Sequence, residues 1–311
     1  MHITYRRKYG DKTLRKIMAW FHRREGLFEI KHMESAPQYI YVPLGVARGS
    51  SEHLVFLYLI TSIMYRDDST QTFRRICSMW GKCPEAFTEN MPDRETLSGL
   101  IKSVGLGYYN DKARNWYKCG EALYHDFHGD PREMFRFPTV DAFIAWKDKV
   151  SRKIGKAFLP GYGPKTYSLL NIFFAEKGVS AVMELPDAMP VDRHIMRQII
   201  SWGIVSGSGV HTASRGVAEM MRKELARFRK KNNESTVAMS HALWLLGTHL
   251  CRRCPQVSGI EHLCPAHDVC GGRVHVALYG KRGQWNMDNL GKDARHPQMT
   301  YPFSVGEFLR E

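Results

Sequence analysis

A lysine and an aspartate stand in two short segments that could carry out chemistry on a polyanion. Lys165 ends the glycine-rich run LPGYGPK, and Asp192 follows 27 residues later. Gly161 and Gly163 permit a sharp turn, and without side chains their backbone N–H groups can approach a phosphate closely. Pro164 suits the first position of a helix. An amine and a carboxylate beside a phosphate-binding turn suggest chemistry on nucleic acid.

Helices are predicted to position both residues. Val140–Lys149 and Pro164–Lys177 enclose the turn, and a further helix, His194–Trp202, begins just after Asp192. Ser51 is predicted to cap the most apolar helix. The other predicted helices are Leu14–Arg24, Leu54–Met64, Thr70–Trp80, Arg94–Val104, Asp111–Phe127, Ala213–Lys230 and Thr236–His249. Three segments have strand-like patterns: Phe28–Ile30, Tyr39–Val42 and Val274–Tyr279.

Charge indicates the class of partner. The 311 residues include 45 Lys+Arg against 31 Asp+Glu, a net charge of +14. Nucleic acid is the simplest partner for this excess, ahead of a membrane surface, although a merely soluble basic protein is the alternative. No apolar run reaches the ~18 residues of a membrane span, and the N-terminus lacks a secretory signal pattern. We therefore expect an intracellular protein, cytoplasmic and nucleoid-associated or nuclear, and not a secreted one.

Four cysteines are concentrated near the C-terminus. Cys251, Cys254, Cys264 and Cys270 form a C-x2-C-x9-C-x5-C pattern. Four thiolates this close can ligate a [4Fe–4S] cluster or a tetrahedral zinc ion, and free thiols are the remaining alternative. The three other cysteines, Cys77, Cys83 and Cys119, are scattered over the helical region and are expected to pack as small apolar side chains.

Four motifs, in order along the chain, resemble those of the helix-hairpin-helix DNA glycosylase superfamily, in its endonuclease III-like branch. The run at Leu159–Thr166 resembles the hairpin signature, and VDRHIxR at residues 191–197 is similar to the loop that bears the catalytic aspartate. GYYNxKAxN at residues 107–115 resembles a third motif, and WLLG at residues 244–247 leads into the cysteines. The resemblance covers roughly residues 50–270.

The resemblance implies a mainly α, two-lobed glycosylase fold. Residues 50–186 would form a six-helix block with the hairpin at about 147–177, and residues 187–270 a second helical lobe with the cluster loop. Residues 1–49 would contribute an N-terminal helix and an irregular segment to the second lobe, and residues 271–311 a small C-terminal extension.

The activity implied is excision of a damaged, mispaired or modified base from double-stranded DNA whose target nucleotide is flipped out. Lys165 would attack the sugar and form a Schiff base, which permits strand cleavage, and Asp192 would stabilise positive charge on the sugar. A [4Fe–4S] cluster is implied, with zinc as the alternative. DNA contacts are expected from Gly161, Tyr162, Gly163, Thr166, Arg252 and Arg253, and an inserted side chain from Met64, Tyr65 or Arg66. A monomer is expected.

Purely structural interpretations of the same residues stay open. Asp192 could be only a helix N-cap, and Lys165 only a phosphate contact. The Arg222–Lys231 run could contact DNA or form a solvated helix face. The cysteine spacing also departs from the family's usual C-x6-C-x2-C-x5-C. The alternatives for function are a non-catalytic hairpin protein that binds DNA or senses damage, and a monofunctional glycosylase that uses water.

Overall fold

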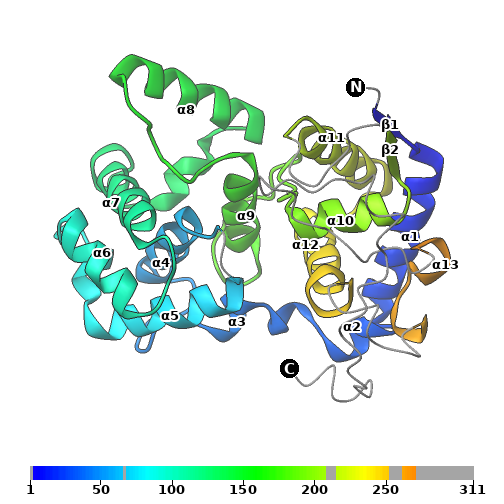
Figure 1. The fold of residues 1–311 in the computed structure, drawn as a ribbon, viewed down its shortest axis with the longest axis horizontal. Helices are drawn as coiled ribbons and strands as arrows, with labels where there is room; N and C mark the ends of the chain where they lie inside the picture. The colour runs from blue at the N-terminus through cyan, green and yellow to red at the C-terminus, as the bar shows by residue number, and fades with distance from the viewer. Residues whose placement is uncertain (1–2, 66–67, 208–214, 252–260, 271–311) are drawn as a thin grey trace. The chain divides into compact units, whose positions relative to one another are not determined.

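The computed structural model describes residues 3–65, 68–207, 215–251 and 261–270, and over these ranges the chain is mainly α-helical (Figure 1). This confirms the mainly α fold class. The chain divides into a central unit, Met33–Pro190, and a terminal unit that combines Met1–His32 with Val191–Glu311. Residues 33–49, which we expected beside the N-terminal helix, belong to the central unit. No helix in the described ranges is long and apolar enough to cross a membrane.

The central unit is built around one helix that is buried on all sides. This is α4 (Ser51–Ser62), whose residues from His53 onward are all buried. It packs against α7 and α9 (Figure 1). The helices of this unit are α3 (Pro37–Ile40), α4, α5 (Ser69–Lys82), α6 (Arg94–Ser103), α7 (Tyr109–Asp126), α8 (Val140–Ile154) and α9 (Pro164–Ala175). Short 3-10 turns occupy Met33–Ser35, Pro84–Phe87 and Pro131–Arg136.

Polar side chains set where these helices begin. Asp68, Asp93 and Thr139 each accept a hydrogen bond from a backbone N–H in the first turn of α5, α6 and α8. Ser50 does the same for α4, where its side chain accepts from the His53 N–H at 3.2 Å. The cap is therefore Ser50, one residue before the predicted Ser51. Each such cap stabilises its helix by about 1 kcal/mol.

The terminal unit joins the two ends of the described chain. Strand β1 (Ile3–Tyr5) pairs antiparallel with β2 (Val205–Gly207). Its helices are α1 (Arg7–Arg23), α2 (Leu27–Ile30), α10 (Arg193–Ser201), α11 (Arg215–Asn232), α12 (Thr236–Leu245) and α13 (His267–Cys270). A π-helical segment, Leu246–Cys251, continues α12, and a 3-10 turn occupies Glu261–Leu263. Helix α12 packs against α1, α10 and α11.

Two predicted strand-like segments are wrong, since both are short helices. Phe28–Ile30 lies in α2, and Tyr39–Val42 overlaps α3. Both helices are only four residues long. A cluster of apolar residues this short fits the helical period of 3.6 residues and the strand period of 2 residues equally well. Pro37 at the first position of α3 was the available signal for a helix start. The third predicted strand, Val274–Tyr279, and the whole 271–311 extension lie outside the described residues.

Much of the basic run on α11 is used inside the terminal unit. Arg227 bonds the Asp11 carboxylate of α1 and also the Glu224 carboxylate at 2.8 Å. Glu224 in turn accepts from Arg7 at 2.6 Å. Arg222 is buried against Glu219 at 2.8 Å. The pairs of Arg227 with Asp11 and of Arg7 with Glu224 join α11 to α1, whereas Arg222 and Glu219 pair within α11. Only part of the Arg222–Lys231 run is therefore a solvated basic face.

Candidate active site

The turn between α8 and α9 requires glycine at position 161. Gly161 has a φ of 91°, and a Cβ atom added there would lie 2.1 Å from the carbonyl oxygen of Ser62. No L side chain fits that approach. Gly163, by contrast, has open space around the position of a Cβ. Leu159 also takes the left-handed conformation, with a φ of 48°, which sharpens the turn.

Core contacts fix this turn against α4 and α7. Tyr162 is 1% exposed, its hydroxyl donates to the Tyr58 carbonyl, and its ring stacks on Tyr58 with 5.3 Å between centroids. The Cys119 thiol donates to the Pro160 carbonyl at 3.2 Å. The Thr166 hydroxyl donates to the Gly161 carbonyl at 2.6 Å. Tyr162 and Thr166, which we expected to contact DNA, therefore serve the internal structure of the turn.

Lys165 is the second residue of α9 and is half-buried. The N-cap of this helix is Gly163, which has no side chain to accept from the first-turn N–H groups, and Pro164 has no N–H. The Thr166 hydroxyl accepts from the Gly163 N–H at 3.1 Å, so the N–H groups left without a described partner are those of Lys165 and Thr166. No described acidic side chain forms a salt bridge with the Lys165 ammonium. The first turn of α9 thus combines unbonded N–H groups, the positive end of the helix dipole and an amine, which together suit an anion.

The turn after α4 lies directly against the hairpin turn, because the Ser62 carbonyl faces Gly161. Met64 and Tyr65 follow, and both are partly buried against the core of the central unit. The Tyr65 hydroxyl oxygen is itself buried. Arg66, the third candidate for an inserted side chain, lies outside the described residues.

Sequence reasoning missed a basic surface at the end of α8. Lys149, Arg152, Lys153 and Lys156 are all exposed and lead into the hairpin turn. The signal was available, because residues 149–156 hold four basic residues and no acidic one. Side chains of this kind contact phosphates well and carry no sequence information.

Tyr108 is a further candidate that the sequence patterns did not single out. It is 51% exposed and takes a left-handed conformation, with a φ of 52°, immediately before α7. An exposed tyrosine in a strained backbone conformation is uncommon in a purely structural position.

Asp192 is the N-cap of α10. Its Oδ1 accepts from the backbone N–H groups of His194 at 2.8 Å and Ile195 at 2.9 Å. The side chain is half-buried, and in the described residues no hydrogen bond involves its Oδ2. The cap alone therefore accounts for one carboxylate oxygen and leaves the other available. Asp192 belongs to the terminal unit and Lys165 to the central unit, so each is described within its own unit.

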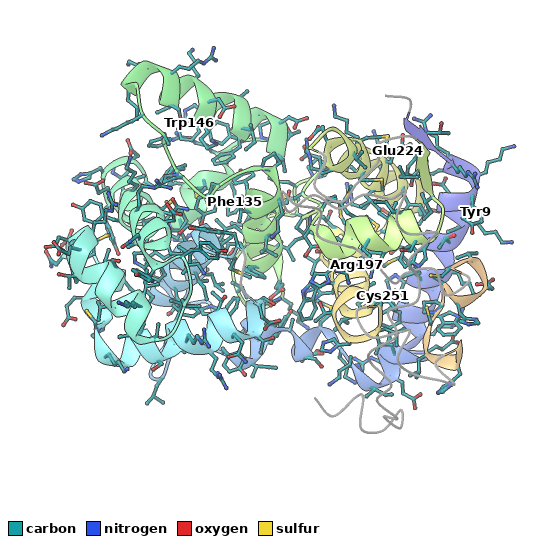
Figure 2. All side chains as sticks on the ribbon, viewed as in Figure 1. Tyr9, Phe135, Trp146, Arg197, Glu224 and Cys251 are labelled. Carbon is teal, nitrogen blue, oxygen red and sulfur yellow. The ribbon has the colours of Figure 1, made fainter. Side chains whose placement is uncertain are left out.

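Three of the four clustered cysteines are buried in the terminal unit. Cys251 ends the π-helical segment after α12 (Figure 2), and Cys264 and Cys270 are likewise less than 9% exposed. The Gln198 side chain amide lies 3.8 Å from the Cys251 sulfur, a contact that favours a negatively charged sulfur. Cys254, Arg252 and Arg253 lie outside the described residues.

The donor chemistry of these cysteines suits a thiolate-bound centre, but the described residues do not complete one. Within them, no group of three or more His, Cys, Asp or Glu side chains is gathered so that it could hold a metal ion. The fourth thiol of the predicted set is Cys254. A site that needs this residue is therefore left as a prediction.

The other cysteines are suited to packing. Burial raises the pKa of Cys77 to about 12, and burial also raises the pKa of Cys119 far above that of a free thiol. A thiol with a raised pKa stays protonated at neutral pH and is a poor nucleophile and a poor metal ligand. Cys119 packs in the core, in agreement with its predicted role as a small apolar side chain.

Comparison with known proteins adds no family to this description: no family model and no curated protein sequence matches the chain.

Proposed function

We propose that this protein is a DNA glycosylase that excises a damaged, mispaired or modified base, with the two-lobed fold of the helix-hairpin-helix superfamily. The observation that carries the proposal is the hairpin turn. Gly161, where an added Cβ would meet the Ser62 carbonyl, lets the turn lie close against α4. Directly after it begins a helix with Lys165 in its first turn and no N-cap side chain that accepts from the first-turn N–H groups. Many proteins grip phosphate with such a turn, but a half-buried lysine at this place also supplies a nucleophile.

The proposed DNA contacts combine backbone and charge. The first-turn N–H groups of α9 would donate hydrogen bonds to a phosphate, and the basic end of α8 would contact phosphates next to it. These contacts read no sequence, which suits an enzyme that must inspect many sites. Double-stranded DNA with a flipped-out nucleotide would be the partner, and the protein would act as a monomer in the cytoplasm or nucleus.

The proposed chemistry separates the roles of the two residues. As the C1′–N bond breaks, positive charge develops on the sugar, and the free oxygen of Asp192 would stabilise it. The base leaves with the bonding electrons and takes up a proton. The Lys165 amine, once unprotonated, would form the new bond to C1′ with its lone pair. The C1′–O4′ bond then breaks as the sugar ring opens, O4′ takes up one of the two N–H protons and solvent takes the other, which leaves a Schiff base. Removal of a C2′ proton then expels the 3′-phosphate.

The cysteines would have a structural part in this proposal. Cys251, Cys264 and Cys270, together with Cys254, would hold a [4Fe–4S] cluster, with zinc as the alternative. When bound, the centre would cross-link the C-terminal loop to the end of α12. It would supply no electrons to the base-excision reaction.

A second candidate is a non-catalytic hairpin protein that binds DNA or senses damage. The observation that favours it is the cap at Asp192, because holding α10 is a sufficient reason for an aspartate there. A third candidate is a monofunctional glycosylase, which would excise the base with water as the nucleophile and would not cleave the strand.

One assay separates these candidates. The protein is incubated with duplexes that carry a panel of damaged or modified bases, and borohydride is added to reduce any Schiff base. We expect a covalent protein–DNA adduct that is lost in Lys165→Gln and kept in Lys177→Gln, a control at an exposed lysine just beyond α9. Base release without an adduct would indicate the water mechanism. If neither base release nor an adduct occurs with any substrate, the binding protein is the better description.

A further inference from the structure

Lys112 is the only lysine side chain in the described residues that is completely buried, with 0% exposure in α7. Lysine is almost never fully buried in a folded protein, because removing an ammonium from water is costly. A structural role alone would be met at lower cost by methionine or leucine. The position therefore suggests that the ammonium itself is needed.

The Lys112 ammonium lies against the turn that follows α4. Its Nζ is 5.4 Å from the centroid of the Tyr65 ring. A lysine ammonium at this distance from a ring centroid is attracted by the electron-rich ring face, and more strongly where burial removes the ammonium from solvent. The Tyr65 hydroxyl oxygen is buried as well, so this side chain is held inside the unit.

The same face of α7 also touches the hairpin turn. Asn115, one helical turn beyond Lys112, is 6% exposed, and its side-chain nitrogen would lie 3.2 Å from a Cβ built on Gly161. Residues three apart share a helix face. One face of α7 therefore contacts both the turn after α4 and the turn before α9.

We propose that Lys112 is a positioning residue that acts through Tyr65 to hold the turn after α4 in register with the hairpin turn. On this proposal Tyr65 is the anchor of the turn and not the side chain inserted into DNA, which leaves that role to its neighbours. The inference rests on the proposed base-excision function. Its consequence is that Lys112 determines how well a protein side chain fills the space left by an extruded nucleotide. It does not determine how tightly the protein binds phosphates.

The test uses a duplex with a tetrahydrofuran abasic site next to 2-aminopurine, whose fluorescence rises when the bases unstack. Affinity is measured in parallel for the same duplex without the abasic site. The variants are Lys112→Met, Tyr65→Leu, Tyr65→Phe and the double variant Lys112→Met/Tyr65→Leu. Lys118→Met, at a half-exposed lysine of the same helix, is the control.

We expect Lys112→Met and Tyr65→Leu each to lower the preference for the abasic duplex by about tenfold, with unchanged affinity for the undamaged one. The double variant should be no worse than either single one, because both remove the same contact. Tyr65→Phe and Lys118→Met should keep the preference and the fluorescence rise. A purely structural role would instead lower both affinities together.

The inference is overturned if the wild type prefers the abasic duplex and Lys112→Met keeps that preference, or if the two single effects add in the double variant. Should Lys112→Met fail to fold, Tyr65→Leu and Tyr65→Phe provide the test. An equal preference for the abasic duplex in these two variants would show that the Tyr65 ring has no role, and would overturn the inference. A wild type that does not distinguish the two duplexes overturns the proposed function itself, and this inference with it.

Discussion

The two segments that carry the candidate catalytic residues begin their helices in opposite ways. At the start of α10, capping the helix is a sufficient reason for an aspartate at position 192, because its Oδ1 accepts hydrogen bonds from two backbone N–H groups. At the start of α9 the N-cap is Gly163, so no N-cap side chain accepts from the first-turn N–H groups, and the Thr166 hydroxyl accepts only from the Gly163 N–H. Lys165 forms no salt bridge with any described acidic side chain. One helix start is complete without a ligand and the other is not. The incomplete one is where a phosphate would contribute most to stability.

The largest expected effect is at the hairpin turn of the central unit. Gly161→Ala should lower the free energy of unfolding by more than about 3 kcal/mol, because the added Cβ meets the Ser62 carbonyl and φ is positive. Gly163→Ala is the matched control, since nothing lies within 4 Å of its Cβ position. It should change the same quantity by less than about 1 kcal/mol. Urea denaturation followed by circular dichroism measures both, and similar losses would contradict the close approach.

Acid should distinguish the two units. His53 is buried in the first turn of α4, and loss of solvation, reinforced by Arg48, lowers its pKa to about 4. The folded protein keeps His53 neutral while the unfolded chain takes up a proton near its ordinary pKa of 6.5. The central unit should therefore lose up to about 3 kcal/mol as the pH falls from about 6.5 to about 4. His53→Gln should remove this dependence.

The terminal unit should respond at lower pH. The hydrogen bond from Arg227 is the main cause that lowers the pKa of Asp11. A carboxylate with a lowered pKa stabilises the folded state above its ordinary pKa, and this contribution is lost only as the pH falls through the lowered value. Hydrogen exchange should therefore accelerate in α4 before it accelerates in α1 as the pH is reduced. The reverse order would show that other groups control acid stability.

Sequence patterns were reliable where a long helix buries one face or all faces. The apolar run of α4 and the starts of α8 and α9 at Val140 and Pro164 were predicted from periodicity and helix-start signals. Four-residue helices such as α2 were not recognised, because they are shorter than the period that identifies a helix. The candidate site was predictable in its residue types but not in its burial. Nothing in the pattern shows that Tyr162 is enclosed in the core or that Lys112 is completely buried, since both depend on packing between distant segments.

A moderate effect on stability is expected at Asp192. Asp192→Ala removes the cap of α10 and should cost about 1 kcal/mol, whereas Asn is as good a cap as Asp and should cost little. If the free carboxylate oxygen also stabilises charge on the sugar, Asp192→Asn should lower the rate of base release by about a hundredfold or more. Thermal unfolding and single-turnover base release measure the two quantities. Equal rates of base release in Asp192→Asn and the wild type would show that Asp192 serves only as the N-cap of α10.

The smallest expected effect on stability is at Lys165. A small effect would show that this lysine is not needed to hold the fold together. Its side chain is half-buried and is joined to no described acidic group, so Lys165→Gln should change the free energy of unfolding by less than about 0.5 kcal/mol. Without DNA, removing a positive charge at the positive end of α9 can even be slightly favourable. With DNA bound, the same substitution removes an amine beside a phosphate, so the stabilisation of the protein by a short duplex should weaken. Thermal unfolding with and without duplex measures the difference. If Lys165→Gln instead destabilises the free protein by several kcal/mol, the lysine holds the fold together, and the contrast between the two helix starts disappears.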